Sequence, residues 1–268
     1  MATLKGPILL EGSIDGMRFY YDSARKKYTA ATKGGATRNL ILNNPNFVRQ
    51  RENMNEFKVA SVWASQLVKS LASIDHLHYG YYFPKIVGLS RNIIKHDDKH
   101  KKGIRSHEAS KCPGLLLSLN FNKKHPFDEV LSQQIDISFS EDKTTVTMKL
   151  LEFNTFHRIN WPEGYGWCRI ILVIAQLPDF VWNEELMKYE PVISGAKKLS
   201  VTTYSRCFSR SPEPEDLILI AKFAQAALQQ PGSTVVVAAG VEFSATHIEP
   251  DVTNERGTGT MKIVACFV

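Results

Sequence analysis

The stretch VVVAAGVEF at residues 235–243 decides the fold class of this chain. It combines β-branched and aromatic residues in a pattern typical of a strand, and turn-forming or polar segments separate it from similar runs. Seven such runs follow Pro113, at residues 115–121, 135–139, 144–151, 168–177, 199–208, 235–243 and 261–268. Because crossover helices do not alternate with them, they predict an antiparallel β-sandwich.

One helix is expected between these strands, within residues 212–230. Its apolar residues recur at helical spacing: Leu217, Ile220, Phe223, Ala224, Ala227 and Leu228. Pro231 and Gly232 would end it. We expect this inserted helix to lie across one end or face of the sandwich.

The N-terminal region predicts a small β-meander. In LEGSIDGMRFYYD, residues 10–22, the Asp15-Gly16 pair is a strong turn signal between strands. Strands are expected at residues 8–10, 17–21 and 28–32, and the meander ends at Lys33-Gly34-Gly35. A ribbon of this size is marginal alone and has unpaired edges, so it must lie on its own domain's sheet or on another subunit.

A long amphipathic helix should follow the meander. Asn44 is suited to the N-cap and Pro45 to the first helical position. Apolar residues then recur every three or four positions from Phe47 to Leu71, and Met54 and Phe57 belong to the predicted buried stripe. The predicted class is therefore α+β: an N-terminal β-hairpin or meander and a long helix, followed by an antiparallel β-sandwich with one inserted helix.

Charge divides the chain into two regions. Residues 1–111 carry 19 Lys/Arg and 9 Asp/Glu, a net charge of +10, whereas residues 112–268 carry 14 and 18, a net charge of −4. We expect a basic N-terminal domain over 1–111 and a sandwich domain over 112–268. A basic half can bind a polyanion, or it can meet the acidic half of another copy.

Composition indicates an ordinary globular chain of 268 residues, of which 43% are apolar. The N-terminus has no apolar run after a basic start, and the longest apolar runs are too short to span a bilayer. The four cysteines make no CxxC pair, so neither a disulfide scaffold nor a zinc ribbon is expected. We predict a cytoplasmic protein without a membrane partner.

The chain offers few candidates for chemistry. His96 and His100 have the i, i+4 spacing of some zinc sites, but lysines surround them and a solvated charged loop is the preferred interpretation. His157, Cys168 and Cys207 carry no nucleophile signature, and Asp136, Glu152 and Glu242 should face water from their strands. No catalytic, cofactor-binding or metal-binding residue is predicted.

Two loops are candidate ligand sites. The aromatic loop at residues 161–167, WPEGYGW, could stack on a sugar or base, or simply pack on itself. Residues 257–260, GTGT, lack the strand-to-helix context of a phosphate loop and predict a hairpin turn.

Residues 6–60 carry a recognisable order of motifs. They include the hairpin around Ile14-Asp15-Gly16, the turn Lys33-Gly34-Gly35, and a helix start with Phe47, Arg49, Arg51-Glu52-Asn53 and Glu56-Phe57. In this fifth of the chain the sequence resembles an uncharacterised Bacteroidota protein family with a Gly-hairpin, a Lys-Gly-Gly turn and a REN-x-EF helix start. Met17, Arg18 and Tyr21 depart from the family pattern. The resemblance implies a shared N-terminal architecture and a bacterial, cytoplasmic origin, and it implies no activity.

These features favour assembly over catalysis. The expected function is a non-enzymatic structural subunit that self-associates into a ring, tube or filament, because contacts between unlike ends propagate unless they close. The expected interface residues are Phe19, Tyr20, Tyr21, Arg49, Arg51, Glu52 and Glu56. The alternatives are a nucleic-acid-binding module that uses the basic segment 85–111, with weak affinity, and a ligand-binding or enzymatic sandwich that uses residues 161–167.

Overall fold

In the computed structural model the chain forms two compact units, Met1–Arg51 and Glu52–Val268, and each is described by itself. The structure describes residues 2–3, 9–32, 34–117, 119–193, 200–224, 231–247 and 258–268. The predicted α+β class is confirmed, since a strand meander and a long helix precede mostly antiparallel sheets. The domain boundary expected after residue 111 falls inside the second unit.

The first unit contains a four-stranded antiparallel sheet with the order β1-β4-β3-β2. Its strands are β1 (Ala2–Thr3), β2 (Gly12–Ile14), β3 (Met17–Asp22) and β4 (Lys27–Thr32). Asp15 and Gly16 both have positive φ, 44° and 77°, so the predicted Asp-Gly turn joins β2 to β3. The expected strand at 8–10 is wrong at residues 9 and 10, and Ile8 lies outside the described residues.

Polar side chains cap two helix starts, of which the one at Asn44 was predicted. The Thr37 hydroxyl accepts a hydrogen bond from the Leu40 amide at the start of α1 (Arg38–Asn43). The Asn44 side chain then accepts from the Asn46 amide at 2.9 Å, where the 3-10 turn η1 (Pro45–Phe47) leads into α2 (Val48–Ser70). The long helix that the Asn-Pro pair predicts is therefore confirmed.

The second unit is built on a central antiparallel sheet with the order β10-β7-β13-β14. Its strands are β7 (Trp167–Pro178), β10 (Ser200–Tyr204), β13 (Ser233–Ser244) and β14 (Gly259–Phe267), and β11 (Phe208–Ser209) also pairs with β7. Strand β13 is buried along its whole length. Two flanking layers account for this burial.

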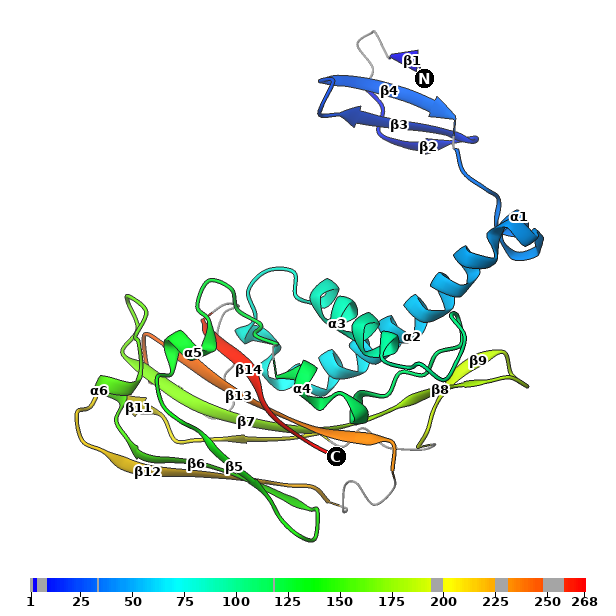
Figure 1. Cartoon of the computed structure of the whole chain (residues 1–268). Coiled ribbons are helices and arrows are strands. Elements are labelled where there is room, and N and C mark those ends of the chain that lie inside the picture. The colour runs from blue at the N-terminus through cyan, green and yellow to red at the C-terminus, as the bar shows by residue number, and fades with distance from the viewer. Residues whose placement is uncertain are drawn as a thin grey trace. The chain divides into compact units, whose positions relative to one another are not determined.

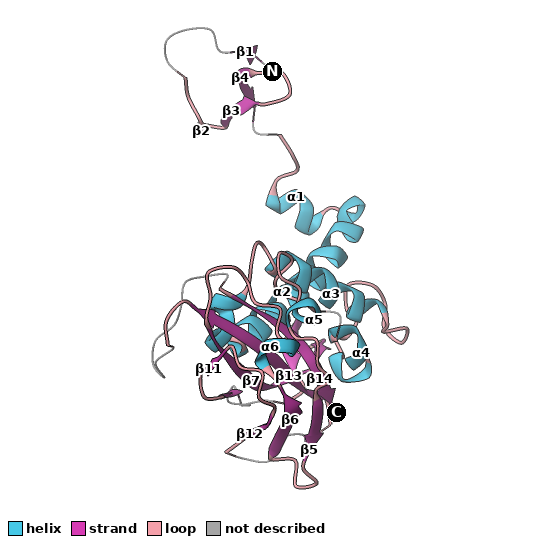
Figure 2. Cartoon of the chain, turned by 90° about the vertical axis from the view of Figure 1, so that its left-hand side faces the viewer, coloured by secondary structure: helices cyan, strands magenta, loops and turns pink. Residues whose placement is uncertain are grey.

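Helices cover one face of the central sheet and a second sheet covers the other (Figures 1 and 2). Helices α2 and α3 (Phe83–Lys95) pack on one face, where Trp63 and Leu67 share a core with Ile171. The second sheet has the order β12-β6-β5, from β12 (Glu215–Lys222), β6 (Thr145–Phe153) and β5 (Asp136–Phe139). Because successive side chains of β7 enter different cores, the strand is apolar without alternation.

Shorter elements connect these layers. The helical ones are η2 (Ala72–Leu77), η3 (Ala109–Lys111), α4 (Pro113–Leu116), α5 (Phe127–Val130) and α6 (Thr155–Arg158). Strands β8 (Phe180–Asn183) and β9 (Lys188–Pro191) form a separate hairpin. None of the helices in the described part of the chain is both long and apolar enough to cross a membrane.

Two expected elements of the sandwich are wrong. Residues 115–117 and 119–121 contain the end of α4 and an isolated bridge at Asn120 instead of a strand, and Ser118 lies outside the described residues. The helix expected within 212–230 is wrong over 215–222, which form β12 on the edge of β6, while residues 225–230 lie outside the described residues. A short helix, α6, interrupts the strands elsewhere.

The predicted buried stripe of the long helix is only partly correct. From Val59 onward the stripe is buried except for the half-buried Val68, and Trp63 lies in the core. Met54 and Phe57 are instead 49% and 52% exposed. The long helix therefore presents apolar side chains on its surface before residue 59.

Candidate functional site

The sheet of the first unit has one mostly apolar face, on which several large apolar side chains are exposed. Cross-strand partners share a face, so Met17 joins Ile14, and Phe19 joins Ala30. We call this surface the apolar face; it consists of Ile14, Met17, Phe19, Tyr21, Tyr28 and Ala30. Ile14, Met17 and Tyr21 are 62%, 40% and 46% exposed.

The apolar face brings together two of the three predicted aromatic interface residues. Phe19 and Tyr21 lie on it, and the Tyr21 ring centroid is 5.0 Å from that of Tyr28. Tyr20 lies on the opposite face, where the Arg18 guanidinium stacks 5.2 Å from its ring centroid. The predicted run of three aromatics is thus divided between two faces.

The four predicted charged interface residues lie in the first turns of α2. Arg51 Nη1 donates to the carbonyl oxygens of Ile41 at 2.6 Å and Asn44 at 2.9 Å, which fixes α1 against the helix start. Arg49 and Glu52 also have interactions within the chain. An interface role for these residues stays a prediction.

Glu56 is engaged with a loop of its own unit. Its carboxylate accepts two hydrogen bonds from Arg105, at 2.8 and 2.7 Å, and one from the Gly103 amide at 2.8 Å. Gly103 has a φ of +91°, and a Cβ there would lie 2.8 Å from Glu52 Cγ. We call this contact the loop clamp; it ties residues 97–107 to α2.

The two histidines weighed as a metal pair lie beyond the end of α3. His96 caps that helix, and His100 Nδ1 hydrogen-bonds Asp97 Oδ2 at 2.7 Å. Burial acts to raise the pKa of Asp97, but hydrogen bonds from the Ser106 amide and the His100 ring outweigh it and lower the pKa to about 2. No group of three or more His, Cys, Asp or Glu in the described residues could hold a metal ion.

Some basic side chains of segment 85–111 form ion pairs or hydrogen bonds within the chain. Arg105 belongs to the loop clamp, and Lys111 pairs with Glu108 at 2.6 Å. Lys85 donates to the Asn120 carbonyl at 3.2 Å. Lys99, Lys101 and Lys102 are exposed in one loop, and Arg91 and Lys95 are exposed on α3, so the charge available to a polyanion is divided between that loop and the helix.

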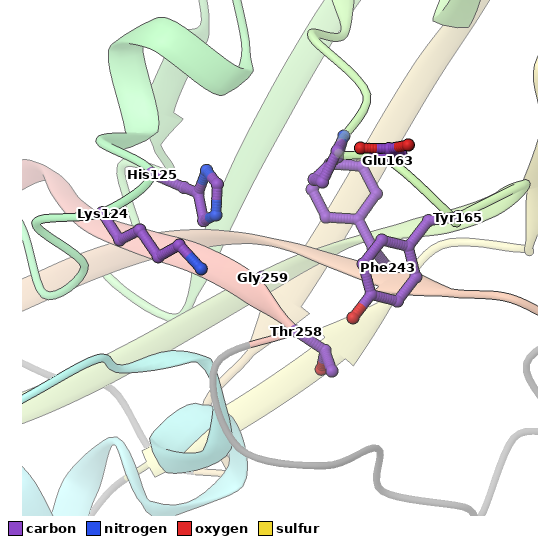
Figure 3. A pocket seen from close by; sticks show the side chains of 8 residues that line it. Lys124, His125, Glu163, Tyr165, Phe243, Thr258 and Gly259 are labelled. Atoms are coloured by element: carbon purple, nitrogen blue, oxygen red, sulfur yellow. The ribbon is translucent and has the colours of Figure 1, made fainter.

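A pocket of about 370 Å³ lies beside the aromatic loop at 161–167 (Figure 3). Four separate segments line it: Lys124 and His125; Pro162, Glu163 and Tyr165; Phe243; and Thr258 and Gly259. Figure 3 shows Lys124 and His125 on one side and Glu163 with Tyr165 on the other. The pocket therefore has a basic wall opposite an aromatic and acidic wall.

Internal hydrogen bonds fix the basic wall. Asn122 is 1% exposed; its Oδ1 accepts from the amides of Lys124 and His125 at 2.9 and 3.0 Å. Its Nδ2 donates to the Gly259 carbonyl at 2.7 Å, which ties this wall to β14. Gly259 cannot carry a side chain, because a Cβ would lie 2.2 Å from the Val241 carbonyl oxygen.

The aromatic wall is anchored to the central sheet. The Trp161 Nε1–H donates to the Thr155 carbonyl at 2.6 Å, and the Gly166 amide donates to the Ser244 carbonyl at 3.2 Å. The Tyr165 ring lies 6.1 Å from the buried ring of Phe243. The sequence allowed two roles for the 161–167 loop, packing on itself or binding a ligand. The structure shows that the loop is packed and that it also lines a pocket.

Glu242 corrects the expectation that strand acids face water. It is fully buried, its Oε1 lies 2.9 Å from His76 Nε2, and its other oxygen accepts from Arg169. Burial acts to raise the pKa of Glu242, but the hydrogen bonds from His76 and Arg169 lower it below the usual value. A lone charge within VVVAAGVEF was the available signal of a buried ion pair.

The residues weighed for thiol or strand-acid chemistry are scattered. Cys168 is buried in the core, and burial raises the pKa of its thiol. His157 is exposed on α6, and Asp136 and Glu152 face water as expected. Sequence reasoning missed Lys124 and His125, whose only signal was their position in a loop between apolar runs.

Comparison with known proteins adds no relative. No protein-family model matches the sequence, and no curated protein matches it. Function is therefore argued from the chain's own geometry.

Proposed function

We propose that the protein is a non-enzymatic structural subunit that self-associates into a ring, tube or filament through its first unit. The observation that carries the proposal is the apolar face, on which Ile14, Met17 and Tyr21 remain largely exposed. Its proposed occupant is a second copy of this chain.

The described residues of the first unit form almost no hydrophobic core. Within its described residues, Ala30 is the one buried hydrophobic side chain. Small sheets need a packed hydrophobic face for stability, because burial of apolar area must offset the conformational entropy lost on folding. Packing the apolar face against another copy would supply that burial.

Edge strands and charge support the same proposal. The outer strands β1 and β2 are very short and pair with only part of the six-residue strands β4 and β3, so the rest of these two longer strands could extend a neighbouring sheet by backbone hydrogen bonds. The net charges of +10 over residues 1–111 and −4 over 112–268 would favour contact between unlike regions of two copies. Unlike contacts propagate into rings or filaments.

A matched pair of substitutions on β2 tests the proposal. Ile14→Lys adds a charge to the apolar face, whereas Ser13→Lys adds the same charge to the opposite face of the same strand, where Ser13 pairs with Arg18. By light scattering at tens of micromolar, the wild-type chain and S13K should be oligomers, and I14K should be smaller. A monomeric wild-type chain, or equal masses for the two variants, would refute self-association through this face.

A further inference from the structure

We propose that the pocket beside the 161–167 loop binds a small organic monoanion that carries a planar ring. The anionic group would lie at Lys124 and His125, and the ring against Tyr165. This site belongs to the second unit and is independent of the proposed assembly.

The basic wall supplies donors for an anion. Figure 3 shows the Lys124 side chain reaching into the pocket, with the His125 ring beside it. Within the described part of the chain, no carboxylate pairs with the Lys124 ammonium and no side chain hydrogen-bonds the His125 ring. Among the described residues, the Lys124 ammonium makes a cation–π contact, 5.9 Å from the Tyr79 ring centroid. A bound carboxylate would therefore gain charge-assisted hydrogen bonds without displacing an internal partner.

The opposite wall supplies a surface for a ring. Tyr165 is half-buried and lines the pocket, and Phe243 supports it from the core. Aromatic rings favour offset-stacked or edge-to-face contact with another ring. The volume of about 370 Å³ lies within the range of small-molecule sites.

The walls are positioned before any ligand arrives. Asn122 holds the backbone of Lys124 and His125 and binds β14, and the 161–167 loop is hydrogen-bonded to β13 and α6. A preformed site loses little conformational entropy on binding. The fixed separation of the walls suits a ligand with its charge at one end and its ring at the other.

Glu163 limits the negative charge that a ligand of this pocket can carry. Its carboxylate lies on the aromatic wall, opposite Lys124 and His125. A second negative charge at the far end of the ligand would approach this carboxylate and be repelled. The pocket should therefore prefer a monoanion to a dianion of the same shape.

Three naphthalene probes test the proposal by calorimetric titration of the full chain. 2-Naphthoate is a monoanion, 2-naphthamide is its neutral analogue, and 2,6-naphthalenedicarboxylate is a dianion. We expect naphthoate to bind at least about tenfold more tightly than naphthamide, the size of one charged hydrogen bond, and more tightly than the dicarboxylate. Absence of naphthoate binding at millimolar concentration, or equal affinity for the acid and the amide, would overturn the proposal.

Variants locate the site. Lys124→Gln should weaken naphthoate binding about tenfold, and Lys123→Gln, its exposed neighbour that does not line the pocket, should not. Glu163→Gln should raise affinity for the dicarboxylate more than for naphthoate. Equal losses in K124Q and K123Q would place binding elsewhere, and an unchanged preference in E163Q would refute the role of Glu163.

Discussion

At position 242 a carboxylate lies on a strand that is buried along its whole length. The Arg169 guanidinium, itself stacked 4.6 Å from the Tyr204 ring centroid, neutralises it, and His76 binds its second oxygen. A buried charge that loses its partner is strongly destabilising, whereas the intact pair adds little net stability. The contacts among Glu242, Arg169 and His76 should therefore affect the free energy of unfolding most when one partner is removed.

Glu242→Gln should lower the free energy of unfolding by about 3 kcal/mol, because it leaves the Arg169 charge buried without its carboxylate. Glu152→Gln is the matched control, an exposed strand acid that should change stability by less than about 0.5 kcal/mol. Urea denaturation of both variants measures the difference. Similar losses for the two would show that burial of Glu242 has no special cost.

His107 should make stability depend on pH. It is fully buried, its Nε2 lies 2.7 Å from the Ser90 hydroxyl, and burial lowers its pKa from 6.5 to about 3. Between these values the unfolded chain binds a proton that the folded chain does not, so the free energy of unfolding should fall as pH decreases from 6.5 to 3. The contribution is at most about 1.4 kcal/mol per pH unit.

The His107→Gln variant isolates this contribution, since the other histidines remain. Denaturation series at several pH values should give a shallower pH dependence for H107Q than for the wild-type chain. Parallel curves for the two proteins would contradict the assignment of the neutral form to His107.

At the scale of elements, the loop clamp determines how residues 97–107 lie on α2. Glu56→Gln removes the ionic character of the bidentate contact with Arg105, whose side chain is mostly buried. This change should lower the free energy of unfolding by about 1.5–3 kcal/mol. Glu215→Gln breaks the similar but exposed pair with Arg206 and should cost less than about 1 kcal/mol. Proteolysis within 97–107 should accelerate in E56Q alone; equal rates in both variants would exclude the clamp.

The sequence predicted most strands because their apolar runs are rich in β-branched residues and bounded by turn signals, as in β7 and β13. It failed at β12, where Leu217, Ile220 and Phe223 fit a helix, although Leu217, Leu219 and Ala221 also alternate as in a strand. Pairing with the edge of β6, a contact between residues distant in sequence, decides between the two. Periodicity alone cannot supply that information.

At the scale of the whole molecule, composition and pattern predicted the order of the elements better than the sites. The 161–167 loop could be identified as a candidate ligand site from the sequence, but the complete pocket could not, because Lys124, Tyr165 and Gly259 come from segments that only the tertiary fold brings together. Phe19 and Tyr21 could be chosen from sequence, since strand alternation is local. Tyr20 was also predicted at the interface but lies on the opposite face, because the sequence pattern did not show which face of the sheet is the apolar one.

The most direct measurement of the central claim is photo-crosslinking from the apolar face. Ile14→p-benzoylphenylalanine in the full chain should, on irradiation, give a covalent adduct between two copies, identified by mass spectrometry. The same probe in place of Ser13, on the opposite face, should give little adduct. Adducts confined to a single chain, or equal yields from the two positions, would contradict the claim that a second copy covers the apolar face.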